Sequence, residues 1–363
     1  MNASNPPRTT ALSDSERGLL RDSLRNQLRR SWPADHAVER SLDPKAVATL
    51  WRELSGLGVT ALGTAAGQSG LREIVLVFEE LGRASCPAPL LGAVAANLAL
   101  ENQRSNAARA ILEDLHLGQA SIAVALGTFD GDPAAGQVEI RDGMLSGTLS
   151  FVEGAQTATH LLVCTGEPPG MAIVAANATG LRIQFTPGLA VPPLSELTFD
   201  NTPTTFCAVA SEILTDIAVV TRLGCAGRAL GSAQRAFELA VEHAKVRKQF
   251  GQLIGQFQAV QHKLADCLTS LDGARLTIES AADAHDRANP DWRFFAAAAL
   301  AFAGPALREV SIQTHRALGA IGYAEEHEAP RHFRRVHADL ARFGGAPRAR
   351  AALADFVLGP VDR

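Results

Sequence analysis

RKQFGQLIGQFQAVQHKLADC, residues 247–267, places a guanidinium, two phenyl rings and several amides at the junction between two expected helices. Arg247 offers rigid donors that suit phosphate oxygens, and Gly251 allows the tight turn that a short connection needs. Phe250 and Phe257 add flat apolar surface. The stretch therefore indicates a binding site for the pyrophosphate of a dinucleotide.

The composition is that of a soluble globular chain, because 47% of the 363 residues are hydrophobic and 20% are charged. A chain of this length is expected to form two or three domains. The formal net charge of -4 provides no basic surface for a polyanion. Nucleic acid is therefore not expected as a partner.

The cysteines give no sign of a disulfide framework or a metal site. The five are widely spaced and form no CxxC or Cys/His cluster. A reducing cytoplasm fits this usage best. The N-terminus lacks the profile of a signal peptide, and no run approaches the roughly 18 apolar residues of a membrane span. We therefore expect a cytoplasmic protein without a membrane span or a bound metal.

Three textures follow one another along the chain and predict a mainly α fold with a central β-domain. Residues 1–117 are mostly helical in pattern, with Ser13 and Glu16 as a capping box. Residues 118–210 contain short β-branched and apolar runs separated by Gly, Asp and Pro, which indicate a small, mainly antiparallel β-domain. Residues 211–363 are rich in Ala and Leu and predict four or five long helices packed as a bundle.

One N-terminal segment shows the helical pattern clearly. IVLVFEELG, residues 74–82, places Ile74, Val77, Phe78 and Leu81 on one face. Gly82 and the prolines that follow predict the end of this helix and an irregular connection.

The order of helical, β and helical parts, together with the RKQFG stretch, resembles the acyl-CoA dehydrogenase family over nearly the whole chain. THRALGAIGYAEEHEAPRHFRR, residues 314–335, is similar to the family's second flavin-contacting segment. The resemblance implies FAD as cofactor, an acyl-CoA thioester as substrate, and an electron-transfer acceptor. It also implies that the two segments contact an FAD held mainly by a neighbouring subunit.

Carried over by position, the resemblance implies a set of cofactor-binding residues. Arg247 would meet the FAD pyrophosphate, and the rings at 250 and 257 would pack near the adenosine or ribityl portion. Arg316 stands where the family usually has Gln, and Gly319 with Ala320 stands for a Gly pair. The complete set is Arg247, Phe250, Phe257, Gln258, Arg316, Gly319 and Ala320. The structural alternative is that Arg247 pairs with a local carboxylate and both rings belong to the bundle core.

The resemblance also shows what this chain lacks. The family's catalytic carboxylate usually occupies one of two positions, which here fall at Phe343 and Thr221. Neither side chain can take up a proton, so no catalytic residue is predicted. In the β-domain, the flavin-binding Thr-Glu-Pro run is replaced by ALGTFDGDPAAG, residues 125–136, in which only Thr128 remains as a contact.

The missing residues are those with which a family member would bind its own flavin and act on its own substrate. The segments that would contact the flavin of a neighbouring subunit remain. The resemblance therefore extends to the non-catalytic subunit of bacterial α2β2 acyl-CoA dehydrogenases, some of which act on steroid side-chain CoA thioesters. Such a chain would complete the FAD site of a homologous subunit that carries the base.

Two alternatives stay open. A homotetramer could use a displaced base, for which the candidates are Asp216, Glu325, Glu326, Glu328 and Asp339. Ion pairs of the three glutamates with Arg331, Arg334 and Arg335 are the simpler explanation. A flavin-free scaffold that kept only the fold is the other alternative. His315 and His327 are expected to pack or lie at the surface rather than to act as acid or base.

Overall fold

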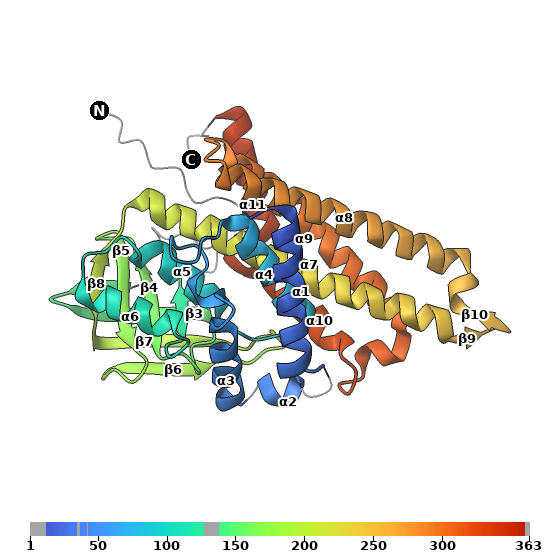
Figure 1. Ribbon diagram of the computed structural model, residues 1–363, viewed down its shortest axis with the longest axis horizontal. Coiled ribbons are helices and arrows are strands. Elements are labelled where there is room, and N and C mark those ends of the chain that lie inside the picture. The colour runs from blue at the N-terminus through green and yellow to red at the C-terminus, as the bar shows by residue number, and fades with distance from the viewer. Residues whose placement is uncertain (1–11, 35–36, 42, 127–137, 360–363) are drawn as a thin grey trace.

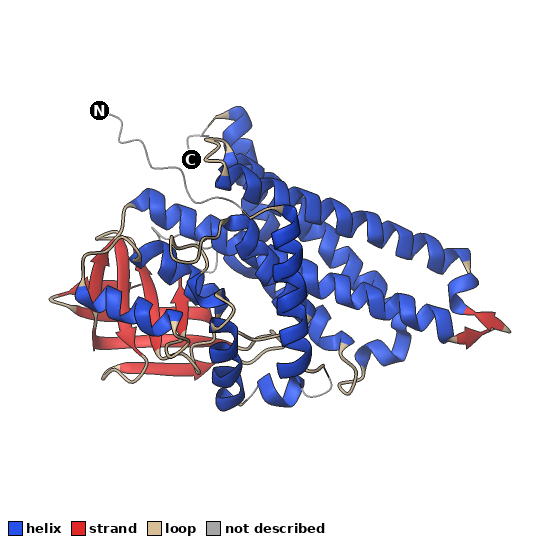
Figure 2. Ribbon diagram, viewed as in Figure 1, coloured by secondary structure: helices blue, strands red, loops and turns tan. Residues whose placement is uncertain are grey.

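The computed structural model describes residues 12–34, 37–41, 43–126 and 138–359. Figure 1 shows three parts in chain order: N-terminal helices, a β-domain at one end of the molecule, and a long helical bundle at the other. Figure 2 shows that helix dominates and that most strands lie in the central part of the chain. The predicted mainly α fold with a central β-domain is confirmed.

The N-terminal part consists of helices, of which α1 packs against α4. Ser13 caps the first helix as predicted, because its hydroxyl accepts from the Glu16 N–H and the Glu16 carboxylate accepts from the Ser13 N–H. The elements are α1 (Asp14–Ser31), α2 (Ala37–Ser41), α3 (Pro44–Ser55), η1 (Val59–Ala61), α4 (Leu71–Arg83), α5 (Leu90–Leu100) and α6 (Asn106–His116).

The predicted end of a helix at Gly82 is wrong, because α4 continues through this residue to Arg83. The expected face of Ile74, Val77, Phe78 and Leu81 is buried. Gly82 lies against the long first helix of the bundle, and any side chain there would overlap the carbonyl oxygen of Arg228. This glycine therefore permits a close approach of two helices.

The β-domain contains two four-stranded sheets. The first has the order β1-β4-β5-β8, in which only the β1–β4 pair is parallel, and the second has the antiparallel order β2-β3-β7-β6. The strands are β1 (Ile122–Ala125), β2 (Val138–Arg141), β3 (Met144–Glu153), β4 (His160–Thr165), β5 (Gly170–Ala175), β6 (Leu181–Phe185), β7 (Leu194–Pro203) and β8 (Thr205–Ala208). The prediction of a mainly antiparallel domain is confirmed.

Successive side chains of β4 point to opposite faces of the sheet, and both faces are buried. Leu161 and Val163 join the core between the sheets, whereas Leu162 and Cys164 join the core shared with the helices. One sheet thus attaches the β-domain to the helical parts.

The C-terminal part is a bundle of long helices, as predicted. Its elements are α7 (Ser211–Val246), β9 (Lys248–Gln249), β10 (Gln252–Leu253), η2 (Ile254–Gln256), α8 (Gln258–Asp286), α9 (Trp292–Leu318), η3 (Gly319–Tyr323), α10 (Ala329–Ala341), η4 (Arg342–Gly344) and α11 (Gly345–Leu358). The β9–β10 hairpin projects at the far end of the bundle from the β-domain (Figure 1).

One described helix contradicts the expectation that no segment is apolar enough to span a membrane. The segment Trp292–Tyr323, which comprises α9 and η3, meets the length and hydropathy of a span. In the structure 44% of its most apolar window is buried, and the helix packs against α7, α8 and α11.

Candidate functional site

The hairpin after α7 presents the predicted pyrophosphate-binding residues at the end of the bundle. Gln249 pairs with Gln252, and the turn between them consists of Phe250 and Gly251, with φ angles of 52° and 80°. The Phe250 ring is 92% exposed. A bulky residue in the left-handed region costs energy, and an exposed ring gains nothing from the core. Both features indicate that Phe250 serves a purpose other than folding.

Arg247 has a fixed backbone and an available side chain. Its N–H donates to the His243 carbonyl oxygen at 2.9 Å, and its own carbonyl accepts from the Ile254 N–H at 2.8 Å. Within the described part of the chain its exposed guanidinium has no hydrogen bond and no ion pair. The alternative of a local carboxylate partner therefore has no support in the structure.

The start of α8 lies beside this arginine and also favours an anion. No side chain caps this helix N-terminus, where Phe257 is the N-cap residue and Gln258 the exposed first residue. Partly buried Phe257 contacts Phe250 edge-on at 6.3 Å between ring centroids. Burial lowers the pKa of nearby His243, and the positive charges of Arg247 and His327 lower it further.

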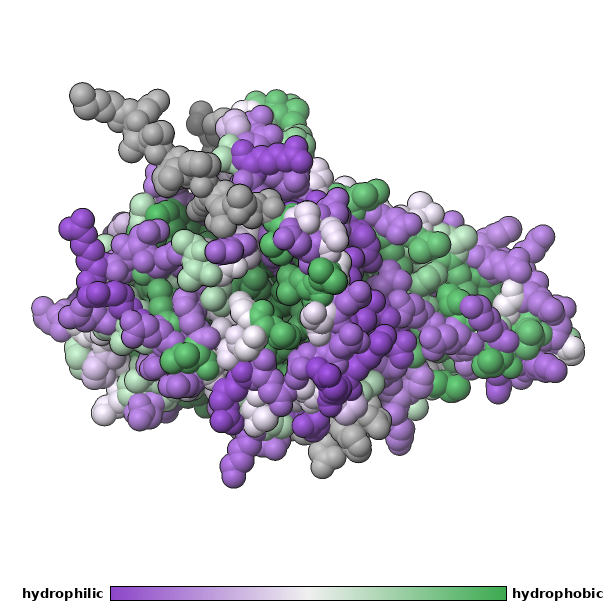
Figure 3. Space-filling view, viewed as in Figure 1, coloured by the Kyte–Doolittle hydropathy of each residue, from purple (hydrophilic) through white to green (hydrophobic). Residues whose placement is uncertain are grey.

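The second predicted segment lies at the same end of the bundle. Leu318, at the end of α9, packs in an apolar cluster with Leu239 and Ala240 of α7, and Leu264 of α8 lies against this cluster. Gly319 then turns the chain with φ 61°. Arg316, Gly319 and Ala320 are exposed. Figure 3 shows that apolar residues reach the surface at this end too, in keeping with exposed Val246 and Phe250.

All seven predicted cofactor-binding residues are thus placed at one end of the bundle, six exposed and Phe257 partly buried. The idea that both rings belong to the core fails for Phe250. The binding roles themselves remain a prediction. Thr128 lies outside the described residues, so its part in flavin binding is not addressed.

A buried ionic network fills the junction between the β-domain and the bundle. Arg228 of α7 donates to both oxygens of Glu153, at the end of β3, at 2.6 and 2.7 Å. It also donates to both oxygens of Asp339 of α10, at 2.9 and 2.6 Å. Arg342 forms a further ion pair with Glu153. We call these four residues the junction network.

Electrostatics keeps the Glu153 carboxylate of the junction network charged. Burial by itself would raise the pKa of Glu153, but Arg228 and Arg342 lower it to about 2. All four side chains are almost completely buried. Sequence reasoning missed this network; the available signal was Arg228 itself, a lone arginine within the small apolar run LGCAGRALGSA.

One of the two positions that lack a base, Phe343, adjoins this network. Phe343 directly follows Arg342, has φ 55°, and lies with its ring 4.8 Å below the Arg342 guanidinium. Thr221 is buried two turns before Arg228 on α7, and its hydroxyl has no partner. Neither residue provides a carboxylate.

The candidates for a displaced base are mostly engaged in ion pairs. Asp339 is buried with both oxygens bonded to Arg228, and Asp216 pairs with Arg293. Glu325 pairs with Arg334, which confirms one predicted surface pair.

Glu328 does not pair with Arg331, Arg334 or Arg335 as predicted, because it faces Arg235 of α7 at 2.6 Å. Burial would raise the pKa of Glu328, but hydrogen bonds from His332 and Arg235 lower it to about 2. Glu326 is exposed. Of the five candidates, only Glu326 forms no ion pair among the described residues.

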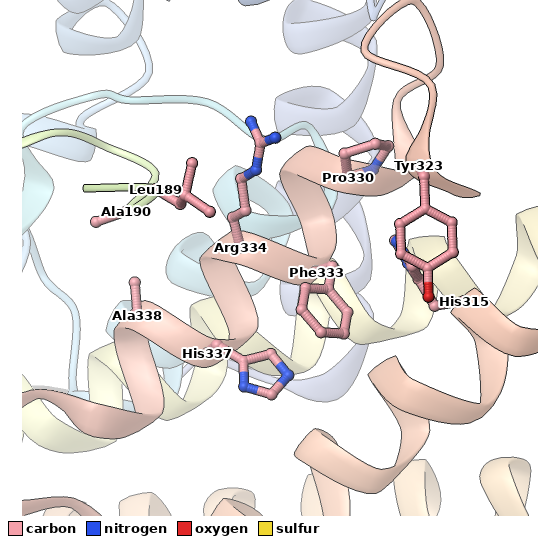
Figure 4. Close-up of a pocket in the computed structure, with 9 residues that line it drawn as sticks. All are labelled: Leu189, Ala190, His315, Tyr323, Pro330, Phe333, Arg334, His337 and Ala338. Atoms are coloured by element: carbon pink, nitrogen blue, oxygen red, sulfur yellow. The ribbon is translucent and has the colours of Figure 1, made fainter. Parts of the chain in front are cut away.

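A hollow of about 570 Å³ adjoins α10, and rings fill one of its walls (Figure 4). His315 contacts Tyr323 at 4.8 Å and Phe333 at 4.6 Å between ring centroids, and Phe333 contacts His337 at 4.3 Å. Burial lowers the pKa of both His315 and His337. The predicted packing role of His315 is confirmed, and His327 accepts from the Ala329 N–H at the start of α10.

Comparisons with known proteins identify relatives of this chain. The model of the acyl-CoA dehydrogenase C-terminal domain matches residues 213–354. Acyl-CoA dehydrogenase IpdE2 of Mycobacterium tuberculosis is 29% identical over 330 residues, which cover 89% of this chain and 91% of that protein. The solved steroid ACAD Tcur3481–Tcur3483 is 28% identical with a TM-score of 0.83, covering 95% of this chain and 98% of its own. The C-terminal part of the chain thus matches the acyl-CoA dehydrogenase C-terminal domain, and nearly the whole chain is similar to acyl-CoA dehydrogenases.

A further structure supports the acyl-CoA dehydrogenase fold alone. The ChsE4–ChsE5 complex of Mycobacterium tuberculosis has a TM-score of 0.83 at 22% identity, covering 96% of this chain and 99% of its own. In this fold the hairpin follows the C-terminal end of α7, whereas the junction network contacts the middle of α7 at Arg228.

Proposed function

We propose that this chain is the non-catalytic subunit of a cytoplasmic, heteromeric acyl-CoA dehydrogenase and completes the FAD site of a homologous partner. One contrast carries the proposal. The Arg247 segment is exposed and, among the described residues, its guanidinium is unpaired, whereas the junction network of buried ion pairs lies beside Phe343, one of the two usual base positions.

The outward segment fits the pyrophosphate end of FAD. Arg247 would donate to the phosphates together with the uncapped N-terminus of α8, where Gln258 is the first residue. Phe250 and Phe257 would cover the adenosine or ribityl portion, and Arg316 with the Gly319 turn would approach from α9. When bound, FAD would accept the hydride that leaves the β-carbon of the acyl group. The residues of this chain would bind and orient the cofactor.

The interior of this chain does not fit a flavin ring or an acyl chain. Glu153, Arg228 and Arg342 form a continuous ionic contact between β3, α7 and α10. Opening this contact would leave buried charges unpaired, which is strongly unfavourable. No proton-transfer step is therefore assigned to this chain, and the partner would carry the base.

The partner and the substrate are proposed from the relatives. The titles of two neighbouring structures each name two proteins, Tcur3481 with Tcur3483 and ChsE4 with ChsE5. The first is described as a steroid ACAD. These names favour an α2β2 assembly that acts on an acyl-CoA thioester, with a steroid side chain as the leading candidate and a separate electron-transfer acceptor.

The test is to co-express this chain with the dehydrogenase-like protein encoded beside it and purify the complex through a tag on this chain. We expect a yellow complex with equal amounts of both subunits and one FAD for each pair. A yellow homotetramer without partner would contradict the proposal and favour a displaced base such as Glu326. Colourless protein in both preparations would favour the scaffold alternative.

Arg247→Ala provides the sharper readout in that complex. Its FAD dissociation constant should rise about tenfold or more, because a charge-assisted hydrogen bond contributes roughly 1.5–3 kcal/mol. Lys245→Ala is the matched control, since it removes an exposed positive charge two residues earlier. Equal FAD affinity of the two variants would remove Arg247 from the site.

A further inference from the structure

The hollow beside α10 is lined mainly by rings and aliphatic groups. His315, Tyr323, Phe333 and His337 form its ring wall, in which each ring contacts at least one other. Leu189, from the loop between β6 and β7, lines it from the side of the β-domain. A volume of about 570 Å³ suits a small organic molecule. The hollow therefore offers such a molecule a mostly apolar surface.

Two large side chains of this lining are left in contact with solvent. Leu189 and Tyr323 are each 72% exposed. Figure 4 shows them on opposite sides of Arg334 and Phe333. A ligand that covered both residues would remove apolar surface from water, which is favourable. Exposed apolar surface around a hollow therefore indicates a binding site.

Neither histidine brings a charge into the hollow at neutral pH. Burial lowers the pKa of both His315 and His337, and positive charges, such as those of Arg334 for His315 and Arg308 for His337, lower it further. His337 Nε2 is already within hydrogen-bond distance of the Ser311 hydroxyl, at 3.1 Å. Both imidazoles therefore act as flat, neutral surfaces.

One cation stands beside this neutral surface. Among the described residues that line the hollow, Arg334 alone carries a full charge at neutral pH. It pairs with Glu325, whose side chain is 62% exposed. An exposed ion pair contributes little to stability, so a second carboxylate can displace Glu325. Figure 4 shows Arg334 leaving α10 on the opposite side from Phe333 and His337. A ligand that reaches both must carry its acidic group at one end of its ring system.

We propose that the hollow binds a small organic acid whose flat apolar ring system packs against Phe333 and His337 and whose carboxylate pairs with Arg334 in place of Glu325. The planar guanidinium matches the two oxygens of a carboxylate, and rings that pack on rings add to the burial of apolar surface. A single cation favours a carboxylate over a phosphate ester, which would bring nearly two charges. The site uses none of the residues proposed to contact FAD, so it stands apart from the proposed function.

The chain contains one tyrosine, and this residue lines the hollow. The full-length chain labelled with meta-fluorotyrosine therefore gives a single fluorine NMR signal, which reports on Tyr323. The test is a titration with naphthoate, with the neutral naphthylmethanol as the matched probe, and calorimetry gives both dissociation constants. We expect saturable binding of naphthoate that shifts the signal, and about fivefold weaker binding of the alcohol, which cannot pair with Arg334.

The same titration is made in the complex with the partner, where the Tyr323→Phe variant identifies the Tyr323 signal by its loss. We expect the same binding there. A partner that abolishes binding would overturn the proposal, because the hollow would then belong to the contact between the subunits. Equal affinity for the acid and the alcohol would also overturn it, since Arg334 would then play no part.

Two substitutions beside the hollow should change naphthoate binding in opposite directions. Arg334→Gln should weaken it about fivefold and leave the binding of the alcohol unchanged. Glu325→Gln should strengthen it about two- to fivefold, because the carboxylate that competes for Arg334 is removed. Arg141→Gln is the matched control, since Arg141 forms an exposed ion pair with Glu139 in the β-domain.

Ala338→Leu separates the space of the hollow from its charge. This α10 residue lines the hollow, so a larger side chain there should weaken the binding of both probes while Arg334 and Glu325 are kept. If Ala338→Leu does not fold, the variants of the exposed ion pair still decide. Absence of saturable naphthoate binding to the natural chain would overturn the proposal. Binding that leaves the Tyr323 signal unmoved, or unchanged affinity in Arg334→Gln, would do the same.

Discussion

Arg228 shows how one buried side chain can join two parts of a protein. Its guanidinium uses Nε, Nη1 and Nη2 to join Glu153 of β3 and Asp339 of α10. A small side chain at this point of α7 would leave space where the β-domain meets the bundle, but an arginine with two carboxylates fills it. The residue therefore fixes the β-domain and the bundle together.

The charged state of Glu153 predicts how the protein responds to acid. Its pKa is about 2 in the folded chain against an ordinary value of 4.5. A lowered folded-state pKa contributes stability above about pH 4.5, and this stability, roughly 3 kcal/mol, is lost as the pH falls towards 2. We expect the free energy of unfolding in urea to fall through this range. Glu328, with pKa about 2, contributes in the same range.

Glu153→Gln isolates the contribution of Glu153. The variant should be less stable at neutral pH by roughly 3–5 kcal/mol, because two buried arginines lose a charged partner. Its stability should also change less steeply between pH 4.5 and 2. Glu139→Gln is the control, since Glu139 forms an exposed ion pair with Arg141 and should change stability by less than about 1 kcal/mol. Parallel pH curves for the natural chain and Glu153→Gln would contradict this assignment.

At the scale of elements, the approach of α4 to α7 depends on glycines. Gly82 of α4 faces the Arg228 carbonyl oxygen, and Gly231 of α7 faces the Glu79 carbonyl oxygen. The two helices therefore pack backbone against backbone. This contact supports the stretch of α7 from which Arg228 reaches the junction network.

Gly82→Ala should destabilise the protein by roughly 1–3 kcal/mol, because the new methyl group forces α4 and α7 apart. Gly18→Ala is the matched control, a glycine within α1 with no atom within 4 Å of an added methyl group. That change should stabilise the chain by up to about 1 kcal/mol through helix propensity. Thermal and urea unfolding of both variants measure the contrast, and a neutral Gly82→Ala would refute the close packing.

Unlike Gly82→Ala, a substitution in the hairpin between α7 and α8 should weaken cofactor binding and change stability little. Phe250 is exposed at a φ of 52°, which Asn tolerates better than Phe. Phe250→Asn should therefore change the free energy of unfolding by less than about 0.5 kcal/mol, while the FAD content of the heteromer falls. Phe78→Ala, in the core of α4, should instead cost roughly 3–5 kcal/mol.

For the whole molecule, local patterns predicted the three-part fold, because helix caps, strand alternation and turn residues act over short stretches of chain. The Ser13 capping box, the Phe250–Gly251 turn and the helices on either side of Asn289 all follow from such signals. The junction network could not be predicted in this way. Arg228 is separated from its partners by 75 and 111 positions, and no local periodicity encodes such contacts. Gly82 was misread for the same reason, since its neighbour is another helix.

The junction network predicts that a carboxylate placed at position 343 pairs with arginine and gives no dehydrogenase activity by itself. Phe343→Glu returns a carboxylate to a usual base position, but Arg342 lies over this side chain and the junction network occupies the space beside it. The new carboxylate should pair with arginine instead of reaching a substrate. We therefore expect no acyl-CoA oxidation by Phe343→Glu alone, measured with an artificial electron acceptor. Phe343→Gln is the control of equal shape.

In the heteromer, Phe343→Glu and Phe343→Gln should both leave turnover unchanged, because the partner would supply the base. Replacing the partner's base should then abolish activity, and Phe343→Glu should not rescue it. Turnover by the Phe343→Glu chain without partner would show that its interior admits flavin and substrate after all. That result would favour the homotetramer that uses its own active site.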